Sequence, residues 1–191
     1  MILPLIEDKE FDKNDFSETE FEQAEYENCQ FRNCNFSNMD VSEAVFADCE
    51  FEHCNLSTAK ITNTTFRNVV FKNCKLLGLH FDECNTFLLL LNFESCQLNL
   101  SSFYQLDMKN TNFENCNLQE VDFTETNLTN ASFTNANLLG AMFEKSILEK
   151  ADLSTSRNFT IDPENNRIKK AKFSRLGLQG LLEKYNIELI N

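Results

Sequence analysis

The stretch VDFTETNLTNASFTNANLLGAMFEKSILEKADLST, residues 121–155, has a bulky apolar side chain at every fifth position, from Phe123 to Leu153. We call each of these residues the centre of a five-residue unit. Neither an α-helix, with its period of 3.6, nor a strand, with its period of 2, turns every fifth side chain the same way. A chain that turns a corner in each unit does so. The stretch therefore predicts a solenoid with its centres inside.

The same period covers most of the chain and is interrupted once. A first run of 15 centres extends from Phe11 to Phe81 and a second run of 13 from Phe93 to Leu153, which makes 28 centres. Two residues before a centre the side chain is usually small, and the other three positions are mostly polar. A large and a small inward residue in each unit fill a narrow interior without voids.

All eight cysteines have the phase of the small inward position: Cys29, Cys34, Cys49, Cys54, Cys74, Cys84, Cys96 and Cys116. Cysteine behaves as a small buried hydrophobe. The spacing contains no Cys-x-x-Cys pair, and the chain has only two histidines, so we expect free thiols and no metal site. No nucleophile–base pair or phosphate-binding loop is recognisable, so we expect neither a cofactor nor an enzyme.

Three units, Ala131–Asn135, Ala136–Gly140 and Ala151–Thr155, come close to the consensus Ala-(Asp/Asn)-(Leu/Phe)-x-x. In this pattern the chain resembles the pentapeptide-repeat proteins over roughly nine tenths of its length. The resemblance implies an all-β fold, a right-handed quadrilateral parallel β-helix with four units in each coil. About seven coils, stacked at roughly 4.8 Å, would make a rod on the order of 35 Å long. Cys34, Cys54 and Cys74 would then form a ladder on one face.

Negative charge is concentrated at the start of the chain. Residues 1–52 hold 15 acidic and three basic side chains, which accounts for −12 of the net charge of −13. One interpretation is that an acidic surface keeps the rods apart in solution. The other is that it attracts a positively charged groove of a partner, and in that case the protein does not itself bind nucleic acid. The candidate partner-binding residues are Asp12, Asp15, Glu18, Glu20, Glu22, Glu25, Glu27, Glu43, Asp48, Glu50 and Glu52.

The interruption, expected at 84–92, puts Phe93 twelve positions after Phe81, where ten would keep the register. We take Leu88 as the missing centre, which leaves Phe87, Leu89 and Leu90 at positions that are polar elsewhere. A bulge can turn some of these side chains inward, which is the interpretation we favour. Alternatively, Phe87, Leu89 and Leu90 form an exposed apolar patch that a partner covers.

The two ends depart from the repeat. Residues 1–6 are apolar, and we expect them to pack over the first coil. They lack the flanks of a secretory signal, and no apolar run is long enough to span a membrane, so we expect a cytoplasmic protein without a membrane partner. Residues 1–173 are the expected β-helix and 174–191 the expected cap, a helix that Ser174 begins, followed by a short strand over 187–190. The cap could close one rod or pair two copies as a homodimer. Its candidate residues are Leu178, Leu181, Leu182, Tyr185, Ile187 and Leu189.

The tail narrows the resemblance. The run Ile161–Ile168 and the cap after it look like the C-terminal end of the group that includes the quinolone-resistance (Qnr) and microcin-immunity proteins. That resemblance implies a non-enzymatic protein that binds DNA gyrase or topoisomerase IV, imitates duplex DNA as an acidic dimer, and protects the enzyme from quinolones or a peptide toxin. The large projecting loops of many quinolone-resistance members are absent here. The alternative is an interaction scaffold for another cytoplasmic protein.

Overall fold

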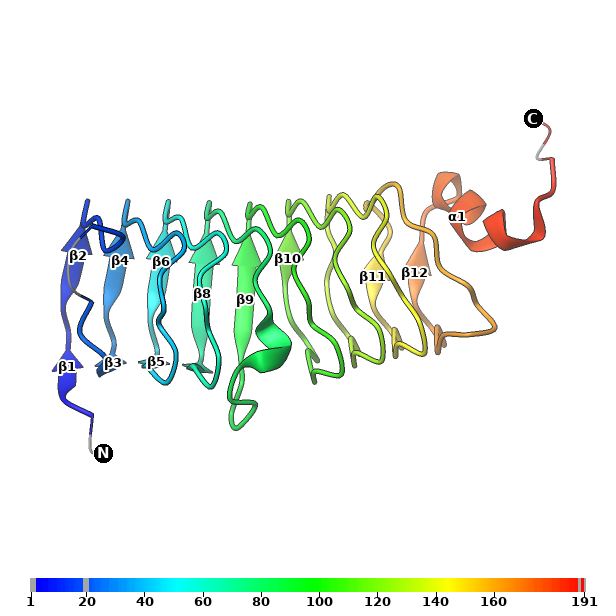
Figure 1. Ribbon diagram of the computed structural model, residues 1–191. Coiled ribbons are helices and arrows are strands. Elements are labelled where there is room, and N and C mark those ends of the chain that lie inside the picture. The colour runs from blue at the N-terminus through cyan, green and yellow to red at the C-terminus, as the bar shows by residue number, and fades with distance from the viewer. Residues whose placement is uncertain (1–2, 19–20, 189, 191) are drawn as a thin grey trace.

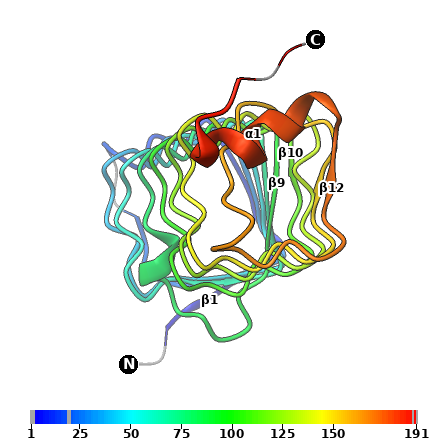
Figure 2. The same cartoon turned by 90° about the vertical axis from the view of Figure 1, so that its right-hand side faces the viewer.

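The computed structural model describes residues 3–18, 21–188 and 190, and shows a rod with a square cross-section (Figures 1 and 2). The chain winds as a right-handed parallel β-helix from the N-terminus at one end to a short helical cap at the other. This confirms the solenoid that the five-residue period predicts and the β-helix that the family resemblance implies. None of the helices in the described part is long and apolar enough to cross a bilayer.

The rod has four faces, which we number in the order that the chain visits them. Face 1 is a parallel sheet of strands β2 (Glu10–Asp12), β4 (Gln30–Arg32), β6 (Glu50–Glu52), β8 (Val69–Lys72), β9 (Leu91–Glu94) and β10 (Phe113–Glu114). The paired strands β11 (Asp152–Leu153) and β12 (Lys172–Phe173) extend it. Faces 2 and 3 are held by single parallel bridges such as Asn35↔Asn55 and His80↔Ser102. Face 4 begins with the sheet of β1 (Leu5–Glu7), β3 (Glu25–Glu27), β5 (Val45–Ala47) and β7 (Thr65–Arg67).

The length follows from the pairing register on face 1. Phe11 pairs with Phe31, and the same register leads rung by rung to Leu153 and then to Phe173. This path takes eight steps, or about 38 Å at a strand spacing of about 4.8 Å. The rod thus has about eight turns. The expected number of seven was low, because Phe173, outside the two runs of centres, forms a further rung.

Corners between faces are made by the second residue after a centre, which has a positive φ in most units. Examples are Asn28 at 52°, Asn33 at 54° and Asn130 at 59°. Asparagine tolerates the left-handed conformation better than most residues do, which explains its frequency at this position. The corner amides bond to the next coil, as the amide of Asn28 does to the carbonyl of Ala47 at 2.9 Å. The backbone therefore turns four times per coil without leaving these donors unpaired.

The interior is filled by stacked phenylalanines. On face 1 the rings of Phe31 and Phe51 are parallel, with centroids 4.6 Å apart, and on face 3 those of Phe81 and Phe103 are 4.8 Å apart. Rings from the two opposite walls meet edge to face, as Phe93 and Phe103 do at 5.8 Å. Offset stacks and edge-to-face pairs are the favoured arrangements of aromatic rings. The rings therefore make favoured contacts both along the rod axis and across the interior.

The eight cysteines are buried and free, as the repeat predicts. Most of their thiols bond to a carbonyl of the preceding coil, for example Cys54 Sγ to the oxygen of Phe31 at 3.2 Å. The ladder of Cys34, Cys54 and Cys74 is linked further, because the amide of Cys34 donates to Cys54 Sγ at 3.4 Å and the amide of Cys54 to Cys74 Sγ at 3.4 Å. Burial raises the pKa of the Cys49 thiol to about 12 and also raises the pKa of Cys84.

The interruption forms a loop that projects from the rod before β9 (Figure 1). The expected centre at Leu88 is wrong. Leu88 is exposed at a corner with φ of 59°, because the unit that begins with the inward Cys84 continues in register. The two extra residues follow it, and Leu89 packs against the core while Leu90 is exposed. Phe71 and Phe93 still stack at 5.6 Å across the insertion, so the loop leaves the ladder unbroken.

Both ends differ from expectation. At the N-terminus, residues 5–7 form the first rung of face 4 and do not pack over the coil, because their backbone pairs with β3; residues 1 and 2 lie outside the described part. The C-terminal helix is short, with α1 (Gln179–Leu182) between the 3-10 turns η2 (Leu176–Leu178) and η3 (Glu183–Tyr185).

Ser174 Oγ accepts a hydrogen bond from the amide of Gly177 at 3.0 Å, so it satisfies a donor at the start of the cap. The expected strand over 187–190 is absent from the described residues there. The chain leaves the rod at this point and has no strand to pair with (Figure 1). Phe159, which the period missed, is buried beneath the cap.

Candidate partner-binding surfaces

The acidic residues of the first coils encircle one end of the rod, since successive units lie on successive faces. Glu20 lies outside the described residues. The structure places the others as follows: Asp12, Glu50 and Glu52 on face 1, Asp15 on face 2, Glu22 on face 3, Glu25 and Glu27 on face 4, Glu43 and Asp48 at corners with a positive φ, and Glu18 in the turn that follows face 2. We call this region the acidic end.

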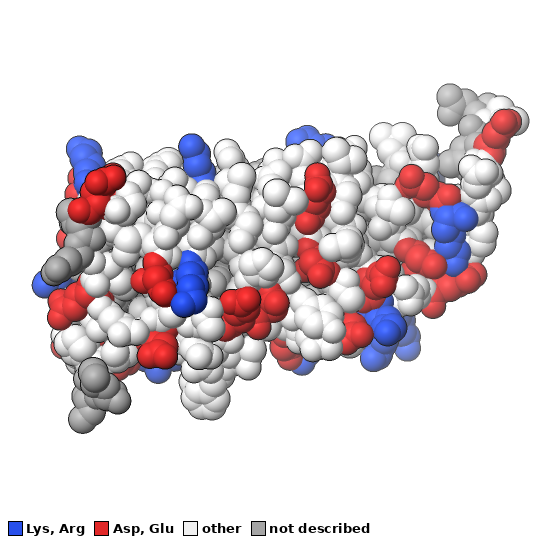
Figure 3. Space-filling model, in the orientation of Figure 1, with Lys and Arg blue, Asp and Glu red and all other residues white. Residues whose placement is uncertain are grey.

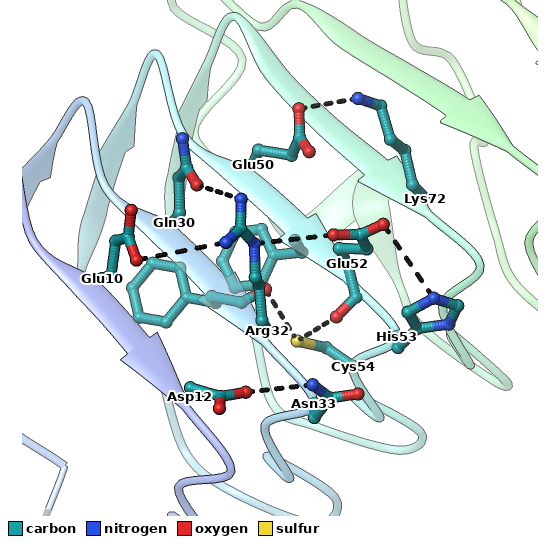
Figure 4. A network of polar contacts seen from close by, with 12 residues as sticks. Glu10, Asp12, Gln30, Arg32, Asn33, Glu50, Glu52, His53, Cys54 and Lys72 are labelled. Carbon is teal, nitrogen blue, oxygen red and sulfur yellow. Dashed lines mark hydrogen bonds and ion pairs between the residues drawn. The ribbon is translucent and has the colours of Figure 1, made fainter.

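Basic side chains partly neutralise face 1 of the acidic end (Figure 4). Arg32 lies between Glu10, at 4.0 Å, and Glu52, at 3.6 Å, and Lys72 contacts Glu50 at 2.8 Å. Ion pairs this exposed contribute at most about 1 kcal/mol each. Within the described part of the chain, Glu22, Glu27 and Glu43 have no basic side chain within 4.0 Å. These three carboxylates without a basic partner therefore lie on faces 3 and 4 and at the corner between them.

The charge density at the acidic end is comparable to that of a nucleic acid. Residues 5–52 fill about two and a half coils, or about 12 Å of rod, and carry a net charge of −12. That is about one negative charge per ångström, whereas duplex DNA has one per about 1.7 Å. The remaining residues carry only −1 over about 26 Å. The rod is therefore strongly polarised along its axis.

The loop before β9 carries a small apolar surface. Phe87 is 72% exposed, and Leu88 and Leu90 are also largely exposed, so the structure leaves two of the three expected patch residues on the surface and turns Leu89 toward the core. We call Phe87, Leu88 and Leu90 the loop patch. A projecting group of apolar side chains on an otherwise polar surface is typical of a contact site.

The cap has a second apolar surface. Leu178, Tyr185 and Ile187 are about half exposed, whereas Leu181 packs on the core and Leu182 is half-buried; Leu189 lies outside the described residues. Leu176, at 94% exposed, and Ile190, at 91%, belong to the same end of the rod and were not among the expected residues. Both are visible in the sequence as apolar residues of the tail, but they do not fit the helical spacing by which the cap residues were chosen.

Polar contacts hold the cap on the last coil. Lys184 Nζ contacts Asp162 at 2.6 Å and Glu164 at 2.7 Å, and Tyr185 donates to Glu164 at 2.8 Å. Hydrogen bonding to Asp162 and Glu164 raises the pKa of Lys184. Ion pairs and the contact with Phe159 thus hold one face of the cap against the last coil. The exposed apolar residues of the cap lie on its outer side.

No catalytic or metal centre is recognisable among the described residues. They contain no group of three or more His, Cys, Asp or Glu side chains arranged to hold a metal ion. The two histidines lie apart, His53 beside Glu52 at 3.9 Å and His80 beside Asp82 at 3.6 Å.

The match to a family model decides the classification. The model described as "Pentapeptide repeat region" matches residues 6–81 and 79–153. The chain belongs to the pentapeptide-repeat family. No curated protein sequence matches it.

The comparison with solved structures supports the fold of this pentapeptide-repeat protein through one match in particular. Full-length QnrB1, a plasmid-mediated fluoroquinolone resistance protein, superposes with a TM-score of 0.60 at 19% identity, over 96% of this chain and 100% of that one. HetL, which is involved in heterocyst differentiation regulation in the cyanobacterium Nostoc sp. strain PCC 7120, matches with a TM-score of 0.48 at 17% identity, over 91% of this chain and 86% of that one.

Proposed function

We propose that this protein is a non-enzymatic, cytoplasmic ligand of DNA gyrase or topoisomerase IV that imitates duplex DNA and protects the enzyme from quinolones or a peptide toxin. The observation that carries the proposal is the acidic end, whose charge per unit length is at least that of duplex DNA. The fold shared with a fluoroquinolone resistance protein supports it. A groove that is positively charged to hold DNA would attract such a rod electrostatically.

The direct test is gyrase supercoiling with purified protein, in the presence and absence of a quinolone. We expect inhibition of supercoiling at high concentration, or rescue from the drug, and binding that weakens steeply with salt because exposed charges are screened. Neither inhibition nor rescue, with gyrase and with topoisomerase IV alike, would contradict the choice of target.

Charge reversal tests the role of the acidic end. The triple variant Glu22→Lys, Glu27→Lys and Glu43→Lys changes three carboxylates without a basic partner, and Lys145 shows that a lysine fits a corner like that of Glu43. We expect at least about tenfold weaker binding, since three exposed attractive pairs become repulsive. The matched control, Glu94→Lys, Glu114→Lys and Glu144→Lys, changes the net charge equally but lies in later coils. Equal losses in both variants would contradict a special role for the acidic end.

The cap supports a further part of the proposal, that two copies pair through their C-terminal ends. Leu176 and Ile190 are almost fully exposed, which is unfavourable unless a second surface covers them. Analytical ultracentrifugation should find a dimer that Leu176→Asp converts to a monomer of unchanged circular dichroism. A wild-type monomer at all concentrations tested would rule out the pairing.

The loop patch favours a second candidate, a scaffold for a different cytoplasmic protein. Its three exposed apolar residues are independent of charge and are not required by the phenylalanine ladder, which continues past the loop unbroken. Suppose that a partner binds the wild type and the charge-reversal variant equally but does not bind the Phe87→Ser variant. That result would support the scaffold over the DNA mimic. Phe87→Ser should leave stability unchanged because the side chain is exposed.

A further inference from the structure

A shallow groove of about 460 Å³ opens on face 3, and none of its lining residues belongs to the acidic end, the loop patch or the cap. It extends over four rungs that pair in the order His80, Ser102, Asp122 and Met142. Ser102 is the smallest of these side chains and lies between larger neighbours, so the floor of the groove is at its position. The groove thus results from the choice of side chains at equivalent positions in successive coils.

The walls of the groove are apolar where the repeat is usually polar. Leu100 is 58% exposed and Met142 is 49% exposed, and Tyr104 shows a large part of its ring on the same rung as Ser102. Leu100 also occupies a left-handed corner, with φ of 62°, a conformation that is unfavourable for a leucine. Neither the core nor the backbone requires these residues. Apolar exposure concentrated in this way indicates a contact surface.

The rim of the groove is acidic. Asp82, Glu120 and Asp122 line it, and no lysine or arginine of the described chain does. Face 3 is turned to the viewer in Figure 3, where the middle of the rod shows red and white surface, and the blue on this face lies toward the two ends of the rod beside red. Asp82 Oδ1 is enclosed without a hydrogen bond, and the nearest base is His80 Nδ1 at 3.6 Å. A carboxylate in this state is stabilised by a cation brought close to it.

The rung spacing defines where that cation fits. Asp122 lies directly over Ser102 in the coil after it, and Asp82 lies in the coil before it, two residues along the chain from the paired His80. A cation above Ser102 is thus one coil, about 4.8 Å along the axis, from each of these rungs, with Asp82 to one side. Tyr104 offers its ring on the same rung, and an aromatic ring attracts a cation over its face. Leu100 and Met142 provide apolar contact for a hydrocarbon stem. The position therefore suits a side chain with an aliphatic stem and a positively charged head.

We propose that this groove binds an arginine side chain of a protein partner. Arginine fits better than lysine because its planar guanidinium can bond to two carboxylates at once and stack on a ring. Nucleic acid is disfavoured because the three carboxylates repel phosphate. The groove is open to solvent on its outer side, as a site for a side chain presented by another surface must be. The assignment does not depend on which protein the acidic end binds.

The test is a titration of the full-length protein with N-acetyl-argininamide, followed by residue-resolved NMR in physiological salt. We expect saturable shifts at Ser102, Tyr104 and Met142, and none with the isosteric neutral N-acetyl-citrullinamide. Asp122→Asn should weaken binding about fivefold, the most that one exposed ion pair contributes. The variant keeps the oxygen that accepts a hydrogen bond from the amide of Thr124 at 2.8 Å. The matched control Asp107→Asn, at the equivalent position on face 4, should leave binding unchanged.

Filling the groove provides a second variant that keeps every carboxylate. Ser102→Met should abolish the shifts without unfolding the chain, because Met142 shows that methionine fits this repeat position. The proposal is overturned if citrullinamide or N-acetyl-lysinamide binds as tightly as argininamide, or if Asp107→Asn weakens binding as much as Asp122→Asn does. Shifts spread over the acidic end, with none at Ser102 and Tyr104, would also overturn it.

Discussion

Replacing Gly180 with alanine tests how the cap docks, because helix propensity and the structure predict opposite signs. Gly180 lies in α1, and alanine in a helix is favoured over glycine by about 1 kcal/mol. In this helix, however, an added Cβ would overlap the carbonyl oxygen of Phe159 and lie 2.9 Å from its Cδ2. Overpacking of this kind costs about 1–3 kcal/mol, with the upper part of the range expected when the obstacle is backbone. We therefore expect Gly180→Ala to lose about 2 kcal/mol of docking free energy.

Hydrogen exchange at Ile161 measures this loss directly, since its amide donates to the carbonyl of Gly180 at 3.0 Å. A loss of about 2 kcal/mol should speed exchange at this amide about 30-fold through local opening of the cap. Gln179→Ala, one residue earlier and exposed, should leave it unchanged. Gly177→Ala should have a smaller effect, because its Cβ would meet the ring edge of Phe159, at 2.8 Å from Cζ, and a ring can move. Slower exchange in Gly180→Ala, or a more stable protein, would refute the docking geometry.

Three further predictions concern the coil. Phe113→Ala removes one ring from two stacks and should cost about 3–5 kcal/mol in urea unfolding, whereas Phe113→Leu should cost less because leucine is a common centre. The native protein should resist a thiol reagent at pH 8, and it should lose stability as the pH rises from about 9 toward 12. In that window the Cys49 thiol is ionised in the unfolded chain but not in the folded protein, where burial raises its pKa to about 12. The free energy of unfolding should therefore fall by about 1.4 kcal/mol per pH unit for this thiol. Cys49→Ala should reduce that fall. Leu100→Asn should raise the melting temperature by relieving about 1 kcal/mol of left-handed strain, and an unchanged or lower value would show that the corner is unstrained.

Much of the fold follows from the sequence because each unit repeats the same local problem. The phase of the cysteines correctly predicts eight buried thiols, and the centres predict the phenylalanine ladders. The loop was mispredicted at Leu88 although a signal was present. Cys84 already marks the inward small position of its unit, so counting on from it places Leu88 at a corner and the insertion after it. The buried Phe159 was missed because the cap that covers it follows no five-residue period.

The surfaces were harder to predict, because a stretch of sequence is not a face in a solenoid. Asp12, Asp15 and Glu22 are close in the chain but lie on faces 1, 2 and 3. Residues of one face are instead about 20 apart, as Ser102, Asp122 and Met142 are. The groove on face 3 becomes visible in the sequence only when the chain is written in rows of one coil. The two-residue insertion shifts those rows, so His80 joins Ser102 at a spacing of 22.

The position of the charge relative to the cap constrains how a DNA mimic of this kind would act. The acidic end begins about 38 Å from the last rung and ends about 26 Å from it, so two copies joined at their caps would carry their charge at opposite ends of a rod on the order of 80 Å long. The middle of that rod would be almost neutral. Such a dimer cannot imitate a continuous duplex, but it can imitate two charged duplex segments held apart. If both ends engage one target, the monomeric Leu176→Asp variant loses avidity and should bind far more than twofold more weakly, with the salt dependence of a single acidic end. If one acidic end suffices, the monomeric variant should bind with full affinity per chain. Measuring the dissociation constants of the wild-type dimer and of the Leu176→Asp monomer at two salt concentrations separates binding by two ends from binding by one.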